Sequence, residues 1–128
     1  MSLINRRRHE RFAVEPMYTG VAVRPLEEDA FRLLGHAYDV SEGGVCLELD
    51  VPLEPGQAVA VRLDLPRWWE GDPGPGRAIF AIGNVVWCDT EEPGPARQAI
   101  AFTRFCRAGD RERLLAALGR AGVRRMAA

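Results

Sequence analysis

Residues 5–12, NRRRHERF, contain a dense cluster of positively charged side chains. Four arginines fall within six positions of a 128-residue chain that has no lysine. A guanidinium donates two parallel hydrogen bonds to a phosphate or to the adjacent acceptors of a guanine edge, and it stacks on a purine ring. A basic tail that is merely solvated, or that binds anions without specificity, fits the same residues. The arginines alone leave both interpretations open.

A second polar stretch, DVSEGG at 39–44, lies about thirty residues further on. Asp39 can accept two hydrogen bonds from the N1–H and N2–H₂ edge of guanine, and Ser41 offers a hydroxyl to a phosphate or a base. Gly43 and Gly44 permit a tight turn and let a flat ligand approach the backbone. The alternative is an ordinary turn between strands, in which Asp39 and Ser41 bond to their own backbone.

The charge distribution argues against a long polyanion as the partner. Residues 1–12 carry four arginines and one glutamate, a balance of +3, so a net charge of −1 leaves −4 on the remaining 116 residues. Nucleic-acid binders usually spread basic residues over a face or a helix. We therefore expect a small anionic ligand and no nucleic acid. Because no apolar run approaches 18 residues and no secretory signal is visible, we also expect no membrane insertion.

The reactive side chains predict neither a cofactor nor an enzyme. Cys46, Cys88 and Cys106 are odd in number and lack a CxxC spacing, which excludes a disulfide framework and a zinc site. We expect all three to be small buried residues in a reducing cytoplasm. The two histidines, His9 and His36, are isolated, and no nucleophile has a base at a readable spacing.

Short alternating runs separated by Pro- and Gly-rich turns predict a small antiparallel barrel or sandwich. A barrel is favoured because closure removes exposed edges. Gly83, inside a long run, indicates a bulge. The segments expected to be strands are 12–24, 31–40, 44–50, 58–65, 78–89 and 98–105.

The last segment changes to a helical period, with Leu114, Leu118 and Ala121 on one side and Asp110 as the expected N-cap. The helix either only packs its leucines on the barrel or also presents a face to a partner. We expect three parts: a flexible Arg-rich arm at 1–12, a β-barrel at 13–108, and a C-terminal helix and tail at 109–128.

Together the two polar stretches resemble the motifs of the PilZ domain family. Arg7 and Arg11 match its RxxxR pair, and Asp39, Ser41 and Gly44 match its DxSxxG motif. The stretches GGVCLEL, GQAVAVRLDL, GNVVW and AIAF are also PilZ-like. Ala99 stands where such sequences often have glycine, a departure expected to lie outside the site.

The resemblance implies an all-β fold, a six-stranded antiparallel PilZ-type barrel with a C-terminal α-helix, that binds the second messenger cyclic di-GMP. Arg7 and Arg11 would grip phosphates and guanine Hoogsteen edges, while Asp39 and Ser41 hold a guanine from the barrel side.

Three further residues belong to the expected site. Gly44 would leave room for the ligand, next to Gly43 in the turn. Arg6, directly before the RxxxR pair, would accompany binding of a stacked, intercalated ligand dimer.

The expected function is that of a bacterial, cytoplasmic, noncatalytic signalling receptor or adaptor. The ligand would order the Arg-rich arm over the barrel and change the interaction with a downstream protein partner. The alternative is a PilZ-like protein-interaction scaffold, for example in a pilus or motility assembly, with weak or no nucleotide binding.

Overall fold

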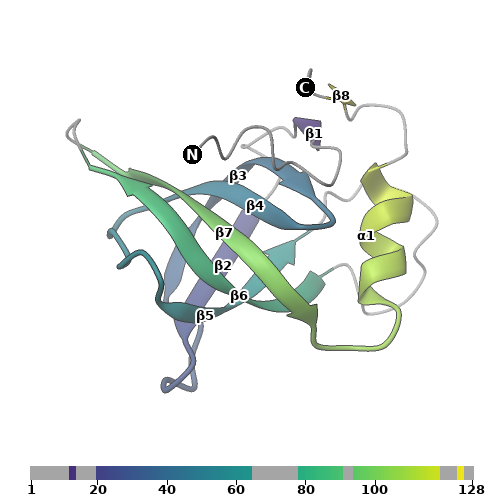
Figure 1. The fold of residues 1–128 in the computed structure, drawn as a ribbon, viewed down its shortest axis with the longest axis horizontal. Helices are drawn as coiled ribbons and strands as arrows, with labels where there is room; N and C mark the ends of the chain where they lie inside the picture. Colours follow the sequence, from purple (N-terminus) through teal and green to yellow (C-terminus); the bar gives the residue numbers. More distant parts are fainter. Residues whose placement is uncertain (1–11, 14–19, 65–77, 91–93, 119–123, 126–128) are drawn as a thin grey trace.

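The computed structural model describes residues 12–13, 20–64, 78–90, 94–118 and 124–125. Six antiparallel strands form a closed barrel in the order β2-β5-β6-β7-β4-β3, and pairing of β2 with β3 completes the circle (Figure 1). The predicted six-stranded barrel with a C-terminal helix is confirmed. The six strands are β2 (Gly20–Pro25), β3 (Leu33–Ser41), β4 (Gly44–Leu49), β5 (Ala58–Asp64), β6 (Ala78–Asp89) and β7 (Ala96–Phe105).

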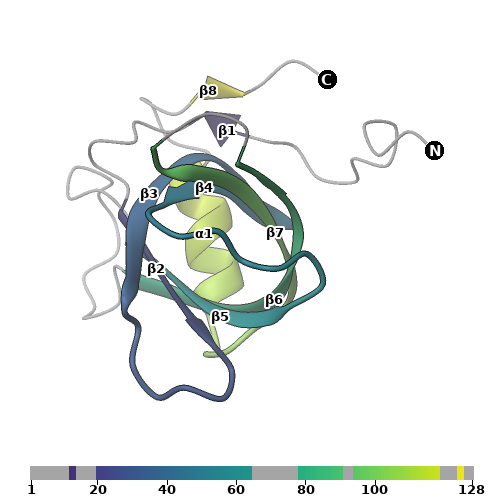
Figure 2. The same cartoon turned by 90° about the vertical axis from the view of Figure 1, so that its left-hand side faces the viewer.

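Two short strands lie outside the barrel, next to β3 (Figures 1 and 2). β1 (Phe12–Ala13) pairs with β3, and β8 (Arg124–Arg125) pairs with β1. The expectation of one strand from Phe12 to residue 24 is wrong, because β1 and β2 are separate strands that pair with different parts of β3.

The barrel interior follows from the period-two runs. In β4 the buried residues are Val45, Leu47 and Leu49, as the alternation predicted, and β5 buries Val59, Val61 and Leu63 in the same way. The register shifts between Ile82 and Gly83, next to the predicted bulge, but the extra residue is Thr103 of the partner strand β7. A Cβ at Gly83 would lie 2.3 Å from the Ala101 carbonyl oxygen, so glycine lets the backbones approach there.

Helix α1 (Asp110–Leu118) lies across one end of the barrel (Figure 2). Leu114 and Leu118 are buried in the core, which confirms that these leucines pack on the barrel. The expected N-cap is shifted by one residue, since the Gly109 carbonyl accepts the Arg113 N–H at 2.9 Å and Gly109 therefore occupies the cap position.

Asp110 instead fastens the helix to β6. Its carboxylate is fully buried, accepts the Phe80 backbone N–H at 3.0 Å, and forms ion pairs with Arg107 and Arg113 at 3.1 and 2.8 Å. The Arg107 guanidinium also stacks on the Phe80 ring, 4.7 Å from its centroid. One carboxylate thus joins the start of α1 to the strand beneath it.

The expectation that all three cysteines are buried is wrong. Cys46 and Cys88 are half-buried, and Cys106 is exposed because it follows the last residue of β7. Among the described residues, no helix has the length and apolar character that crossing a membrane requires.

We expect Asp110→Ala to lower the free energy of unfolding by about 3 kcal/mol, because it leaves the Phe80 N–H and two guanidiniums without their acceptor. Urea unfolding at an unchanged m-value measures the loss. The control is Glu112→Ala on the same helix turn, whose side chain is 69% exposed and which should cost about 0.5 kcal/mol or less. Equal losses in the two variants would contradict the role given to Asp110.

Candidate functional site

The DxSxxG residues form the hairpin between β3 and β4. Ser41 pairs with Gly44 across the turn, and the Ser41 hydroxyl accepts the Gly43 N–H at 3.0 Å. The Gly43 carbonyl accepts the Phe102 N–H at 2.8 Å, which ties the turn to β7. Ser41 therefore bonds to its own turn, as the ordinary-turn interpretation predicted, and the turn is anchored to the barrel.

Gly44 has a role in the packing of the barrel itself. Positive φ angles occur among the described glycines at Gly56, Gly94 and Gly109, and not at Gly44. A Cβ at Gly44 would lie only 2.3 Å from the Ile100 carbonyl oxygen of β7. Glycine at this position allows β4 and β7 to approach closely, whatever it does for a ligand.

A bulge in β3 decides which way Asp39 faces. Ala37 is opposite Leu47, but Asp39 is opposite Cys46, so Tyr38 is one extra residue on β3. Ala37 and Val40 are both buried, whereas Asp39 is only half-buried. Since directly opposed residues share a face, Asp39 lies with Cys46 on the outer surface of the barrel.

A second bulge does the same for Trp87. Val85 is opposite Ile100 and Trp87 is opposite Ala99, which makes Val86 the extra residue on β6. Val85 is buried, and the Trp87 side chain is 39% exposed. Trp87 therefore faces outward with Ala99.

The two bulges complete a row across the outside of four neighbouring strands. Asp39 of β3 is opposite Cys46 of β4, Cys46 is opposite Ala99 of β7, and Ala99 is opposite Trp87 of β6. The middle of the row consists of small side chains, and its ends carry a carboxylate and an indole. Because Cys46 and Ala99 in its middle are small, the row leaves space above them for a flat ring between a hydrogen-bond acceptor and an aromatic surface. We call these two small residues the floor of the row.

Sequence reasoning missed Trp87 as a site residue and placed Ala99 outside the site. The register puts both on the row that contains Asp39. The aromatic residue in GNVVW was the signal in the sequence that could have indicated a stacking surface. Strict alternation from the buried Val85, however, predicts that Trp87 points inward. Only the bulge reverses this.

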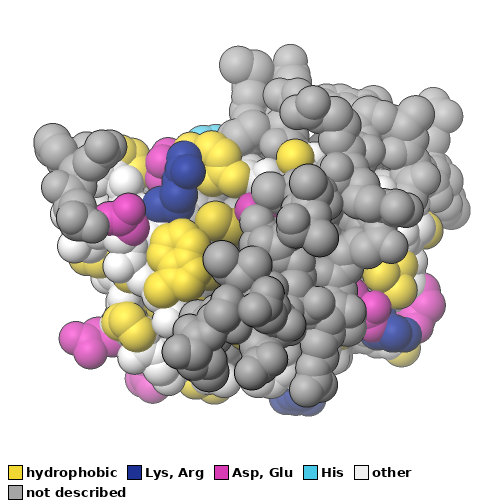
Figure 3. Space-filling view, turned by 45° about the horizontal axis from the view of Figure 1, so that its top comes forward, with side chains coloured by type: hydrophobic (Ala, Val, Ile, Leu, Met, Phe, Trp, Pro, Cys, Tyr) yellow, Lys and Arg dark blue, Asp and Glu magenta, His cyan; other side chains and the backbone are white. Residues whose placement is uncertain are grey.

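A polar cluster borders the row beside Asp39. The Arg97 guanidinium stacks on the Tyr38 ring at 4.5 Å from its centroid. Partial burial raises the pKa of the Tyr38 hydroxyl, and its hydrogen bond to the Glu48 carboxylate raises that pKa further. On the face shown in Figure 3, hydrophobic side chains accordingly lie beside a basic side chain and acidic ones.

The expected arginines Arg6, Arg7 and Arg11 lie outside the described residues. The first described residues after them do bear on the site, because Phe12 is opposite Val40 and Ala13 is opposite Asp39. The arginine-rich segment thus joins the barrel beside the DxSxxG motif.

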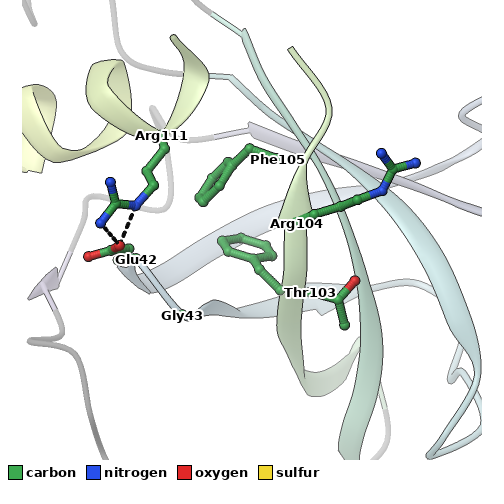
Figure 4. Close-up of a pocket in the computed structure, with 7 residues that line it drawn as sticks. Glu42, Gly43, Thr103, Arg104, Phe105 and Arg111 are labelled. Carbon is green, nitrogen blue, oxygen red and sulfur yellow. Dashed lines mark hydrogen bonds and ion pairs between the residues drawn. The ribbon is translucent and has the colours of Figure 1, made fainter. Parts of the chain in front are cut away.

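A pocket of about 410 Å³ lies on the other side of the turn, between it, the end of β7 and helix α1 (Figure 4). Glu42 of the turn forms an ion pair with Arg111 of α1, while Arg104 points away from that pair. Phe102 and Phe105 meet edge to face with their ring centroids 5.6 Å apart. The pocket shares Gly43 with the predicted site but includes neither Asp39 nor Ser41, so it overlaps that site only at the turn.

The described parts of the chain contain no group of three His, Cys, Asp or Glu side chains that could hold a metal ion.

A family model of the PilZ domain matches residues 5–119. The chain belongs to the PilZ domain family. This family comprises cyclic di-GMP receptors and adaptors, and the described barrel and helix have the PilZ fold.

Two solved structures share that fold. The PilZ domain of YcgR from Escherichia coli, solved with c-di-GMP, is 15% identical with a TM-score of 0.62, and the match covers 87% of each chain. The inhibitor of motility MotI/DgrA of Bacillus subtilis is 19% identical with a TM-score of 0.60, over 85% of this chain and 47% of that one. The present chain thus spans about half the length of the Bacillus protein. No curated protein matches the chain.

We expect Gly44→Ala to destabilise the PilZ barrel by about 1–3 kcal/mol or more in the absence of any ligand, because its Cβ meets the β7 backbone. Thermal and urea unfolding measure this effect. Gly20→Ala is the matched control, since the nearest described atom to its Cβ would be the Asp64 Oδ2 at 3.6 Å. If Gly44→Ala unfolds like the Gly20 variant but loses ligand, Gly44 serves the ligand and not the barrel.

Proposed function

We propose that this PilZ domain is a noncatalytic cyclic di-GMP receptor of the bacterial cytoplasm. The observation that carries the proposal is the pairing of Ala13 with Asp39. It joins the arginine-rich segment to the barrel at the carboxylate suited to a guanine edge. The Escherichia coli neighbour solved with c-di-GMP, whose barrel has the same fold, supports the choice of ligand.

The chemistry divides between the barrel and the arm. Asp39 accepts hydrogen bonds from the N1–H and N2–H₂ of a guanine that lies over Cys46 and Ala99. The Trp87 ring contacts the apolar surface of the same guanine. Arg7 and Arg11 bind the phosphates and the Hoogsteen edge of the base. The site has one carboxylate for the base and several guanidiniums for the two phosphates of the ligand.

Binding orders the arm over the barrel. Fixing the backbone of the seven residues 5–11 costs roughly 1–2 kcal/mol of conformational entropy per residue. Each charge-assisted hydrogen bond to the ligand contributes roughly 1.5–3 kcal/mol of favourable free energy. Several such bonds, together with stacking, are needed before any net affinity remains. The loss of one arginine therefore abolishes binding instead of weakening it slightly.

The response reaches a downstream protein partner through the surface that the ligand reorganises. The Glu42–Arg111 ion pair connects the DxSxxG turn to helix α1, so that a change at the turn also affects the helix. The arm and the exposed side of α1, which includes Leu115, are the surfaces on which a partner would detect the ligand.

We expect wild-type protein to bind cyclic di-GMP saturably and to bind neither GTP nor a short RNA with comparable affinity. Arg7→Ala and Arg11→Ala should each lose at least a hundredfold in affinity, because each removes phosphate and base contacts together. Calorimetric titration measures the binding. Arg62→Ala is the control, since Arg62 is exposed and paired with Asp64 at 3.0 Å.

Wild-type-like binding by either arginine variant would contradict the proposed site. Absence of binding by the folded wild-type protein would instead favour a protein-interaction scaffold.

We expect Arg6 to support a stacked ligand dimer, since a third cation offsets the added phosphate charge. The calorimetric stoichiometry should be near two ligands per chain in the wild type and near one in Arg6→Leu. A stoichiometry of one that Arg6→Leu leaves unchanged would contradict the dimer.

A further inference from the structure

β8 extends the candidate site beyond the two family motifs. Arg124 is opposite Ala13, and Ala13 is opposite Asp39, so these three residues continue the outer row onto two more strands. The complete row crosses β6, β7, β4, β3, β1 and β8, which are consecutive neighbours in the sheet. It begins at Trp87 and ends at the Arg124 position.

The neighbouring Arg125 belongs to a different row. Arg125 is opposite Phe12, and Phe12 is opposite Val40, which is 1% exposed and faces the barrel interior. Successive residues of a strand alternate between the two faces of a sheet. The Arg124 position is therefore on the face that carries Asp39, and the Arg125 position is on the opposite face.

The two segments that contain β1 and β8 are both basic. Residues 1–12 have a balance of +3, and residues 119–128 contain three arginines and no acidic residue, also +3. With a net charge of −1 for the whole chain, residues 13–118 carry −7. The structure thus pairs Phe12–Ala13 directly with Arg124–Arg125, strands that come from the two most basic segments of an acidic chain. Two basic segments whose strands pair directly favour an anionic ligand beside them.

We propose that Arg124 is a further ligand-binding residue, and that a phosphodiester group of the bound cyclic dinucleotide lies at β8, on the row that contains Asp39. This inference rests on the proposed function. Two strand spacings, about 10 Å in all, separate the positions of Asp39 and Arg124, so one ligand can present a base edge to the first and a phosphate to the second. β8 then completes the site from the C-terminal end of the chain.

Arginine on an outermost strand has another established use, which is to prevent edge-to-edge aggregation. That use requires charge on the edge and no particular face. The two neighbouring arginines therefore provide the test, since they carry equal charge and differ in the row to which they belong.

The experiment compares the 128-residue wild type, Arg124→Gln and Arg125→Gln by calorimetric titration with cyclic di-GMP at several salt concentrations. We expect Arg124→Gln to weaken binding about tenfold and to reduce the dependence of affinity on salt, while Arg125→Gln stays within about twofold of the wild type. Thermal unfolding without ligand should be the same for all three, which excludes a folding defect.

Each outcome decides a separate point. If the wild type binds and the two variants weaken equally or not at all, the inference about Arg124 is overturned and the proposed function stands. If the folded wild type does not bind cyclic di-GMP, the proposed function fails and the inference fails with it. A variant that aggregates while its binding is unchanged assigns the arginines to edge protection alone.

Discussion

One extra residue in β3 determines whether Asp39 lies on the surface of this barrel or in its core. With strict alternation, Ala37, Asp39 and Ser41 would share one face, and the buried Ala37 shows that this face is the core. Tyr38 forms the bulge that reverses the phase, so that Val40 enters the core and Asp39 faces outward. A carboxylate inside an apolar barrel would cost several kcal/mol, and the bulge avoids that cost while placing the acceptor on the surface.

The same part of β3 brings the two chain ends to the site. Among the described residues, β2 pairs with residues 33–36 of β3, and β1 pairs with Asp39 and Val40 of the same strand. An unpaired edge offers its N–H and C=O groups to any strand that can reach them. The arrangement of strands thus brings Phe12–Ala13, and through it Arg124–Arg125, beside the DxSxxG hairpin.

Much of the fold was predictable from the sequence, because the runs in β4 and β5 alternate without interruption and turn residues separate them. The motif residues were also identifiable, since Asp39, Ser41 and Gly44 follow an arginine pair at a characteristic separation. The bulges at Tyr38 and Val86 were not, because an inserted residue in a strand leaves the composition of the run unchanged. Trp87 was missed for this reason. The separation of β1 from β2 depends on pairing partners, which no local pattern specifies.

The alternation along β4 and β7 has a consequence for how such domains diversify. Cys46 lies between Val45 and Leu47, and Ala99 lies between Gln98 and Ile100, so each floor residue is flanked in sequence by residues that fill the interior. A substitution at the floor positions alters the height and polarity of the exterior without touching the residues that hold the barrel closed. Residues of the outer row and residues that fill the core therefore occupy alternate positions of the same strands, and selection can change the outer surface while leaving the core intact.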